Sequence, residues 1–146
     1  KEHINLSERT TSLAGEFGID LKASIGNFDG SIASYNRALE TLILDIGRVR
    51  GQLAKHTPEN VQEDIRRELQ TLGGMLSLVG DPKGSEYAKS LANDFAMVEA
   101  KQSDQDALKQ SITRFVAHLD HVSHIGKLLI SYLATELRRT GDNVSV

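Results

Sequence analysis

The sequence contains no cysteine and no tryptophan, and it has only two prolines among its 146 residues. Without cysteine, disulfide frameworks, zinc sites built on thiolates and cysteine nucleophiles are all excluded. The scarcity of proline, and of aromatic residues at 5% of the chain, favours helices over a β-sandwich. Because the length is that of one ordinary domain, we predict a single helical domain over residues 1–146.

The chain also lacks a strong excess of one charge and a long apolar run. Its formal net charge is −3, and its basic residues are interleaved with acidic ones, which argues against nucleic acid as a partner. A transmembrane helix needs about 18 or more nearly uncharged residues. The longest charge-free run with substantial hydrophobicity extends only from Gln70 to Gly80, so we predict no transmembrane segment within the chain.

One stretch has a strong helical pattern, because apolar residues recur there at alternating steps of four and three. This average period of 3.5 is typical of a helix that buries one stripe against other helices, as in a coiled coil. The members of this stripe are Leu21, Ile25, Phe28, Ile32, Tyr35, Leu39, Leu42, Ile46, Val49 and Leu53. We therefore expect this stretch to organise the core.

A turn signal lies within the stripe. Asp29-Gly30 is a pair that often occupies turns, and Asp29 or Ser31 could cap a new helix. Gly15–Gly18 is a second place where a helix could be interrupted. Because the four-three spacing continues through the Asp-Gly pair, we favour one long, kinked helix over about residues 7–55 and keep the interrupted alternative open.

Three shorter patterns follow, each with its own start or stop signal. Thr57 is a suitable N-cap and Pro58 suits the first helical position, while Asp81–Gly84 forms a stop-and-turn sequence after the second helix. Ser103 is a suitable N-cap for the last helix. The predicted helices are about residues 7–55, 58–79, 85–101 and 104–139.

The predicted lengths of these helices, together with their short loops, constrain how the helices are arranged. At 1.5 Å per residue the first and last would be about 50–70 Å and about 53 Å long, and the middle two only about 33 Å and about 25 Å. Short loops make neighbouring helices antiparallel. We therefore predict an all-α, antiparallel up-down-up-down four-helix bundle with long first and last helices. Their surplus length would emerge together beside both chain ends, where a shift of one helix against the other could reach an attached output domain.

Three histidines at steps of three, His118, His121 and His124, are the feature most similar to a ligand cluster. This spacing brings neighbours within reach of one metal ion, but a closed site needs further ligands that the sequence does not supply. With Leu119 on the buried stripe, His118 lies at its edge and the other two point outward. We therefore predict surface residues, no metal and no cofactor, with a metal site at these histidines as the lesser alternative.

Four glycines show a second regularity, because Gly26 and Gly30 recur three heptads later as Gly47 and Gly51. In one continuous helix they would share an outer face. Glycine inside a helix costs about 1 kcal/mol relative to alanine, so four on one face need a reason. We name them as candidate self-association residues of a homodimer, and keep a bend or a tolerant surface as the alternative.

The chain has no Gly-rich phosphate loop, His-Glu-x-x-His pair or nucleophile elbow, and we predict that it is not an enzyme. Its long terminal helices resemble the four-helix-bundle sensors of bacterial chemoreceptors and histidine kinases. The segment SIGNFDGSIASYNRALETLILD, residues 24–45, is similar in style to helical N-terminal regions of some diguanylate cyclases. These resemblances imply a sensory, regulatory or protein-interaction domain of a bacterial signal-transduction protein, extracytoplasmic or cytoplasmic, with an attached output domain and a small ligand of unknown identity.

Two other functions stay open at this point. One is a histidine phosphotransfer bundle, in which the outward His121 or His124 would accept a phosphoryl group, although neither has the flanking residues of kinases or of transfer domains. The other is a structural or secretion-related helical protein. The full reading frame would distinguish these functions, because a sensor requires an output domain or membrane spans beyond the present chain.

Overall fold

The computed structural model describes residues 6–55, 65–99 and 105–140. Within these ranges the protein is all-helical, with 88% of the residues in helices and no strand, which confirms the all-α part of the prediction. The helices are α1 (Glu8–Glu16), α2 (Leu21–Gly26), α3 (Ile32–Ala54), α4 (Ile65–Val79), α5 (Pro82–Glu99) and α6 (Gln105–Thr140).

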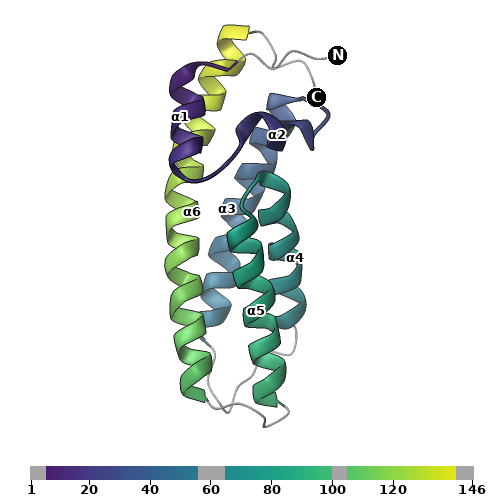
Figure 1. The fold of residues 1–146 in the computed structure, drawn as a ribbon, viewed down its shortest axis with the longest axis vertical. Coiled ribbons are helices and arrows are strands. Elements are labelled where there is room, and N and C mark those ends of the chain that lie inside the picture. Colours follow the sequence, from purple (N-terminus) through teal and green to yellow (C-terminus); the bar gives the residue numbers. More distant parts are fainter. Residues whose placement is uncertain (1–5, 56–64, 100–104, 141–146) are drawn as a thin grey trace.

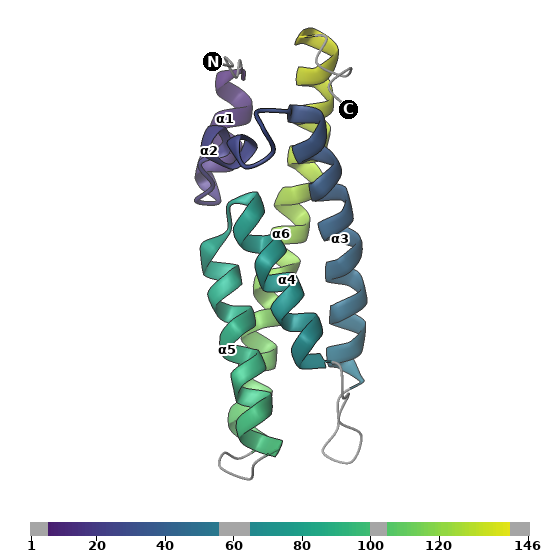
Figure 2. The same ribbon diagram turned by 90° about the vertical axis from the view of Figure 1, so that its right-hand side faces the viewer.

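Helices α3, α4, α5 and α6 lie side by side along the long axis of the molecule, and we call them the framework (Figures 1 and 2). Along the chain, each framework helix runs in the opposite direction to the one before it. The predicted stripe from Leu21 to Leu53 faces the core, with every member buried except the partly buried Phe28. Tyr35 is fully buried in this core, and its hydroxyl donates a hydrogen bond of 2.6 Å to the carbonyl oxygen of Val79 in α4.

The predicted continuous helix over residues 7–55 is wrong, because the chain forms α1, α2 and α3 there. The first break follows Glu16, where Gly18 has a φ of +84°. The second follows Gly26, where Asp29 and Gly30 have φ values of 58° and 77°. A left-handed backbone at these positions ends an α-helix, so the turn signals rather than the apolar period decide the local structure.

The helix that follows each break begins with its own N-cap residue. The side chain of Asp20 accepts a hydrogen bond of 3.3 Å from the backbone N–H of Ala23 at the start of α2. The side chain of Ser31 accepts one of 3.1 Å from the backbone N–H of Ser34 at the start of α3. Ser31 therefore caps α3, as the interrupted alternative allowed.

The third predicted helix, residues 85–101, begins three residues earlier than expected, at Pro82 of α5. Asp81 caps it, since its Oδ1 accepts a hydrogen bond of 3.1 Å from the backbone N–H of Gly84. Proline at the first helical position loses nothing by lacking an N–H. The reversal of the chain is thus concentrated at Gly80, whose φ is +107°.

The other predicted boundaries agree more closely with the structure. α4 ends at Val79 and α6 covers Gln105–Thr140, against predicted ranges of 58–79 and 104–139. The predicted starts at residues 58 and 104 and the predicted end at residue 101 lie outside the described residues. No helix in the described ranges is long and apolar enough to cross a membrane.

α6 extends beyond the turn between α4 and α5, and α1 packs against this overhanging part (Figures 1 and 2). The expected stalk of two long helices is therefore altered. α6 has its expected length of 36 residues, but α3 has only 23, and the chain before it folds back to form α1 and α2. The surplus of α6 is covered by a short separate helix.

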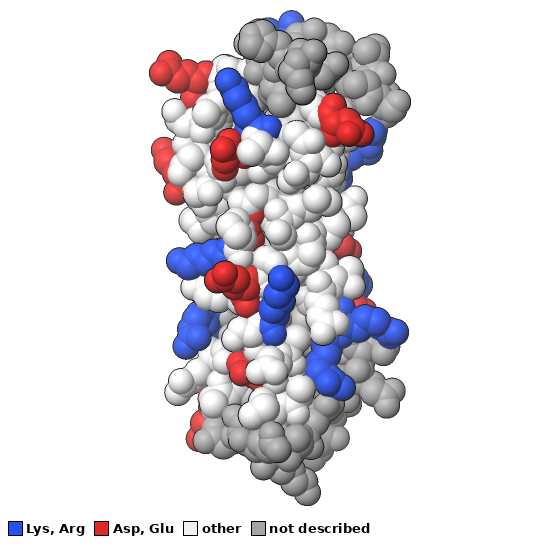
Figure 3. All heavy atoms as spheres, turned by 45° about the vertical axis from the view of Figure 1, so that its right-hand side comes forward, with Lys and Arg blue, Asp and Glu red and all other residues white. Residues whose placement is uncertain are grey.

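Charged side chains of both signs share the face of the molecule seen in Figure 3. Some form ion pairs between helices, such as Arg50 of α3 with Asp120 of α6 at 2.7 Å. Both of these side chains are about half exposed, at 50% and 53%, so the pair adds little to stability. This ion pair therefore contributes little to the packing of α3 on α6.

Candidate functional site

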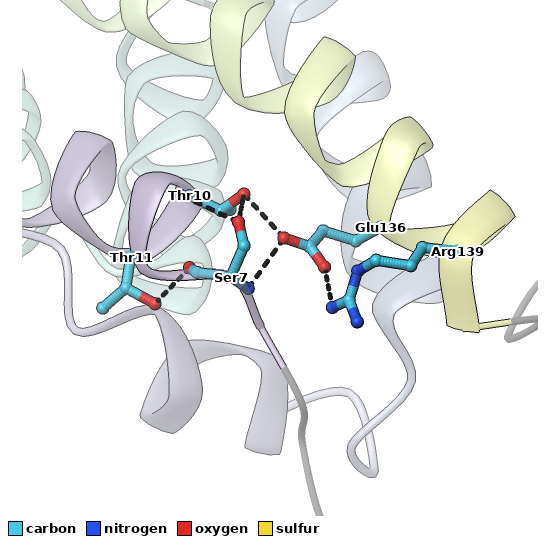
Figure 4. A network of polar contacts seen from close by, with 5 residues as sticks. All are labelled: Ser7, Thr10, Thr11, Glu136 and Arg139. Carbon is cyan, nitrogen blue, oxygen red and sulfur yellow. Dashed lines mark hydrogen bonds and ion pairs between the residues drawn. The ribbon is translucent and has the colours of Figure 1, made fainter.

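A buried carboxylate joins the start of α1 to the end of α6 (Figure 4). Glu136 of α6 is only 2% exposed. Its Oε2 accepts a hydrogen bond of 2.8 Å from the backbone N–H of Ser7 and another of 2.8 Å from the hydroxyl of Thr10. Arg139, almost one turn further along α6, donates a hydrogen bond to Oε1. Both carboxylate oxygens are therefore bonded, and they connect segments from the two ends of the described chain.

The local sequence around Ser7 explains why a carboxylate is needed here. Ser7 is the N-cap of α1, and its side chain accepts a hydrogen bond of 3.3 Å from the N–H of Thr10. In a capping box, an acidic residue three positions after the N-cap bonds back to the N-cap N–H. α1 has Thr10 at that position, and Glu136 of α6 supplies the carboxylate instead. The cap of α1 is thus completed by a residue of another helix.

The hydrogen bonds around Glu136 also determine its charge. Burial of the carboxylate raises its pKa. Hydrogen bonds from Ser7, Arg139 and Thr10 lower the pKa by more than burial raises it, so that its value is about 2. The carboxylate is therefore ionised near neutral pH. A buried, ionised group with all its partners in place becomes costly when one partner is removed. We call Ser7, Thr10, Glu136 and Arg139 the α1–α6 network.

A pocket of about 390 Å³ opens beside the α1–α6 network, between α1 and α6. Its volume is in the range of small-molecule sites. It is lined by Ser7, Arg9, Thr10, Ser131, Tyr132, Thr135, Glu136 and Arg139. The guanidinium carbon of Arg9 lies 5.1 Å from the centre of the Tyr132 ring, which is a cation–π contact between the two helices. The network and this contact both hold α1 on α6 at the pocket.

The three histidines of α6 do not converge on one point. His118 is partly buried, and its Nε2 lies 2.8 Å from Oδ2 of Asp81, the residue that caps α5. Its ring packs against Phe17, which follows α1, and against Tyr87 of α5. Within the described ranges, no group of three or more His, Asp or Glu residues is arranged to hold a metal ion. His118 therefore lies where the end of α1, the α4–α5 turn and α6 meet.

His121 and His124 are both exposed, which is the arrangement expected from their positions beside the buried stripe. His121 also has a ring neighbour, since its centroid lies 4.8 Å from that of Phe17 in an edge contact. Neither residue belongs to the α1–α6 network. The proposed phosphoacceptor role of these histidines stays a prediction.

The four candidate glycines do not share a helix face. Gly26 is the last residue of α2, Gly30 lies in the following turn, and Gly47 and Gly51 lie on the exposed side of α3. The premise of a common face is wrong because α2 ends at Gly26 and α3 begins only at Ile32, so no single helix contains all four glycines. A β-carbon at Gly26, Gly47 or Gly51 would meet no atom within 4 Å, so no close approach inside the chain requires glycine there.

The sequence interpretation did not identify any residue of the α1–α6 network, although one signal was present. The step from Leu129 to Leu133 is four residues and the step from Leu133 to Glu136 is three, so Glu136 continues the buried stripe of α6. A single acidic residue at such a position requires buried partners. Arg139 was visible only as part of a basic pair, and nothing in the sequence connects Ser7 to Glu136.

Comparison of the chain with protein-family models, with curated proteins and with solved structures finds no match. The arrangement around the pocket and the α1–α6 network is therefore the main basis for a functional proposal.

Proposed function

We propose that this chain is a non-enzymatic sensory or regulatory module whose signal is a change in the docking of α1 on the end of α6. In this proposal the framework acts as an antiparallel four-helix bundle, and α1 is the movable part. The observation that carries the proposal is the buried, ionised Glu136, which completes the N-cap of α1 from α6. The docking of α1 thereby links the two ends of the described chain.

The size of α1 supports its role as the movable part. It has nine residues, whereas isolated helices shorter than about 12–15 residues are marginal in water. Its fully buried residues are Thr10 and Ala14, one of which belongs to the α1–α6 network. α1 therefore depends on its contacts with α6, and a modest change in those contacts would shift its docking equilibrium.

Most of the framework core, in contrast, is formed by the framework helices themselves. Leu42 and Val49 of α3 and Leu119 and Leu129 of α6 have no exposed surface, and they belong to the core cluster that the framework helices share. A two-state element on a stable support is what a relay requires. We propose that an attached bacterial output domain, or a second copy in a homodimer, responds to the docked and undocked forms of α1.

Cleavage by trypsin after Arg9 tests the proposal, because this residue lies within α1 and cleavage there requires the helix to open. We expect E136Q to accelerate this cleavage roughly a hundredfold, since it removes a charge with buried hydrogen-bonded partners. The matched control is E40Q at an exposed position of α3, which should leave the rate unchanged. An equal rate in E136Q and the unaltered protein would exclude the docking mechanism.

A further inference from the structure

We propose that the pocket between α1 and α6 binds a small organic carboxylate, and that Arg9 is its charged partner. The inference rests on the function proposed above, because such a ligand would connect the two helices and hold α1 in its docked position.

Most polar groups around the pocket are already bonded to one another. The N–H of Ser7 and the hydroxyl of Thr10 both donate to Glu136. The hydroxyl of Thr135 donates to the carbonyl oxygen of Ser131 at 3.2 Å and accepts from Arg138 at 3.2 Å. These groups shape the pocket but have little capacity left for a ligand.

Three groups on the pocket wall have hydrogen-bonding capacity that no described residue uses. Arg9 contacts the ring of Tyr132, and no carboxylate in the described part of the chain pairs with its guanidinium group. The hydroxyls of Tyr132 and Ser131 form no hydrogen bond with any described residue. All three can donate hydrogen bonds, and together they come from both α1 and α6. A ligand that accepts hydrogen bonds would therefore bridge the two helices.

The charges select an anion. Among its described residues, the pocket wall carries two guanidinium groups, Arg9 and Arg139, and one carboxylate, Glu136. Because Arg139 bonds to Glu136, Arg9 is the guanidinium group of this wall that pairs with no described carboxylate. A guanidinium group matches a carboxylate through two parallel hydrogen bonds, so a carboxylate fits Arg9 in charge and in shape.

Two further features favour a monoanion with an apolar body over a phosphate. Glu8 and Glu16 line a neighbouring groove together with Arg9 and Tyr132, and their charges oppose a second negative charge nearby. The aromatic ring of Tyr132 gives the pocket wall an apolar surface. An organic acid can use this surface, whereas inorganic phosphate cannot.

Titrations with benzoate, its neutral amide benzamide and inorganic phosphate test the proposal, at constant ionic strength and with amide chemical shifts of α1 and α6 as the readout. We expect benzoate to bind more tightly than the other two. R9Q should weaken benzoate binding about tenfold or more, as expected for the loss of a charged hydrogen-bonding partner. Y132F, which keeps the ring, should weaken it less. R114Q, at an exposed position of α6 outside the pocket, should leave it unchanged.

Equal binding of benzamide, equal binding of phosphate, or unchanged benzoate affinity in R9Q would each overturn the proposal, as would the absence of benzoate-induced shifts at Tyr132. The two proposals fail separately. If benzoate does not bind but E136Q still accelerates cleavage in α1, the ligand class is wrong and the docking mechanism stands. If benzoate binds through Arg9 but E136Q leaves cleavage unchanged, the docking mechanism is wrong.

Discussion

The docking of α1 should depend on pH through Glu136, and E136Q isolates this dependence. The pKa of Glu136 is about 2 in the folded protein, against an ordinary value of 4.5. Since one pKa unit corresponds to about 1.4 kcal/mol, the ionised carboxylate contributes about 3 kcal/mol near pH 7. A lowered folded pKa means that this contribution is complete above about pH 4.5 and is lost as the pH falls toward 2. At pH 3 about 1.4 kcal/mol remains.

Hydrogen exchange of the α1 amides measures this contribution directly, after correction for intrinsic exchange rates. Glutamine resembles the protonated form of Glu136, so E136Q should lower α1 protection roughly a hundredfold at pH 7 and only about tenfold at pH 3. E40Q serves as the exposed control and should change protection little at either pH. A difference between E136Q and the unaltered protein that is the same at both pH values would refute the assignment of the stabilisation to an ionised carboxylate.

Four other substitutions test the packing of the framework. Y35F should destabilise the protein by about 1–2 kcal/mol in urea unfolding, because it removes a buried hydrogen bond to the end of α4. G84A should destabilise the protein by about 1–3 kcal/mol, because a β-carbon there would lie 2.2 Å from Oδ2 of Asp81. G74A is the matched control: a β-carbon at Gly74 would meet no atom within 4 Å, so this substitution should stabilise the protein by about 0.5–1 kcal/mol. G51A should also raise the thermal midpoint, and a lowered midpoint together with weaker association in sedimentation would instead support the glycine-mediated homodimer.

The apolar stripe predicted the core well but could not reveal the continuity of the helices. Leu21 and Ile25 of α2 are buried together with Ile32 and Tyr35 of α3, as the four-three spacing requires. The spacing survives the break because the intervening turn keeps these side chains on the core side. The break itself depends on the left-handed backbone at Asp29, which the periodicity of side chains does not report.

The candidate site was less accessible to sequence reasoning, because its parts lie far apart in the chain. The chain folds back and places α1 on α6 because the helix is broken before α3. A single continuous helix over residues 7–55 could not make this contact. Glu136 occupied a recognisable position on the stripe of α6, but its partner Ser7 could only be identified once the direction of α1 was known. Long-range polar contacts of this kind are determined by the tertiary fold rather than by local sequence.

The distance between α1 and α6 provides the most direct test of the central claim. Because the chain contains no cysteine, spin labels can be attached at cysteines introduced at the exposed positions Ser12 of α1 and Lys127 of α6. We predict one narrow distance distribution near neutral pH and a second, longer one in E136Q, while labels at Glu40 of α3 and Lys127 keep their distance. An unchanged distance from α1 to α6 in E136Q would contradict the account.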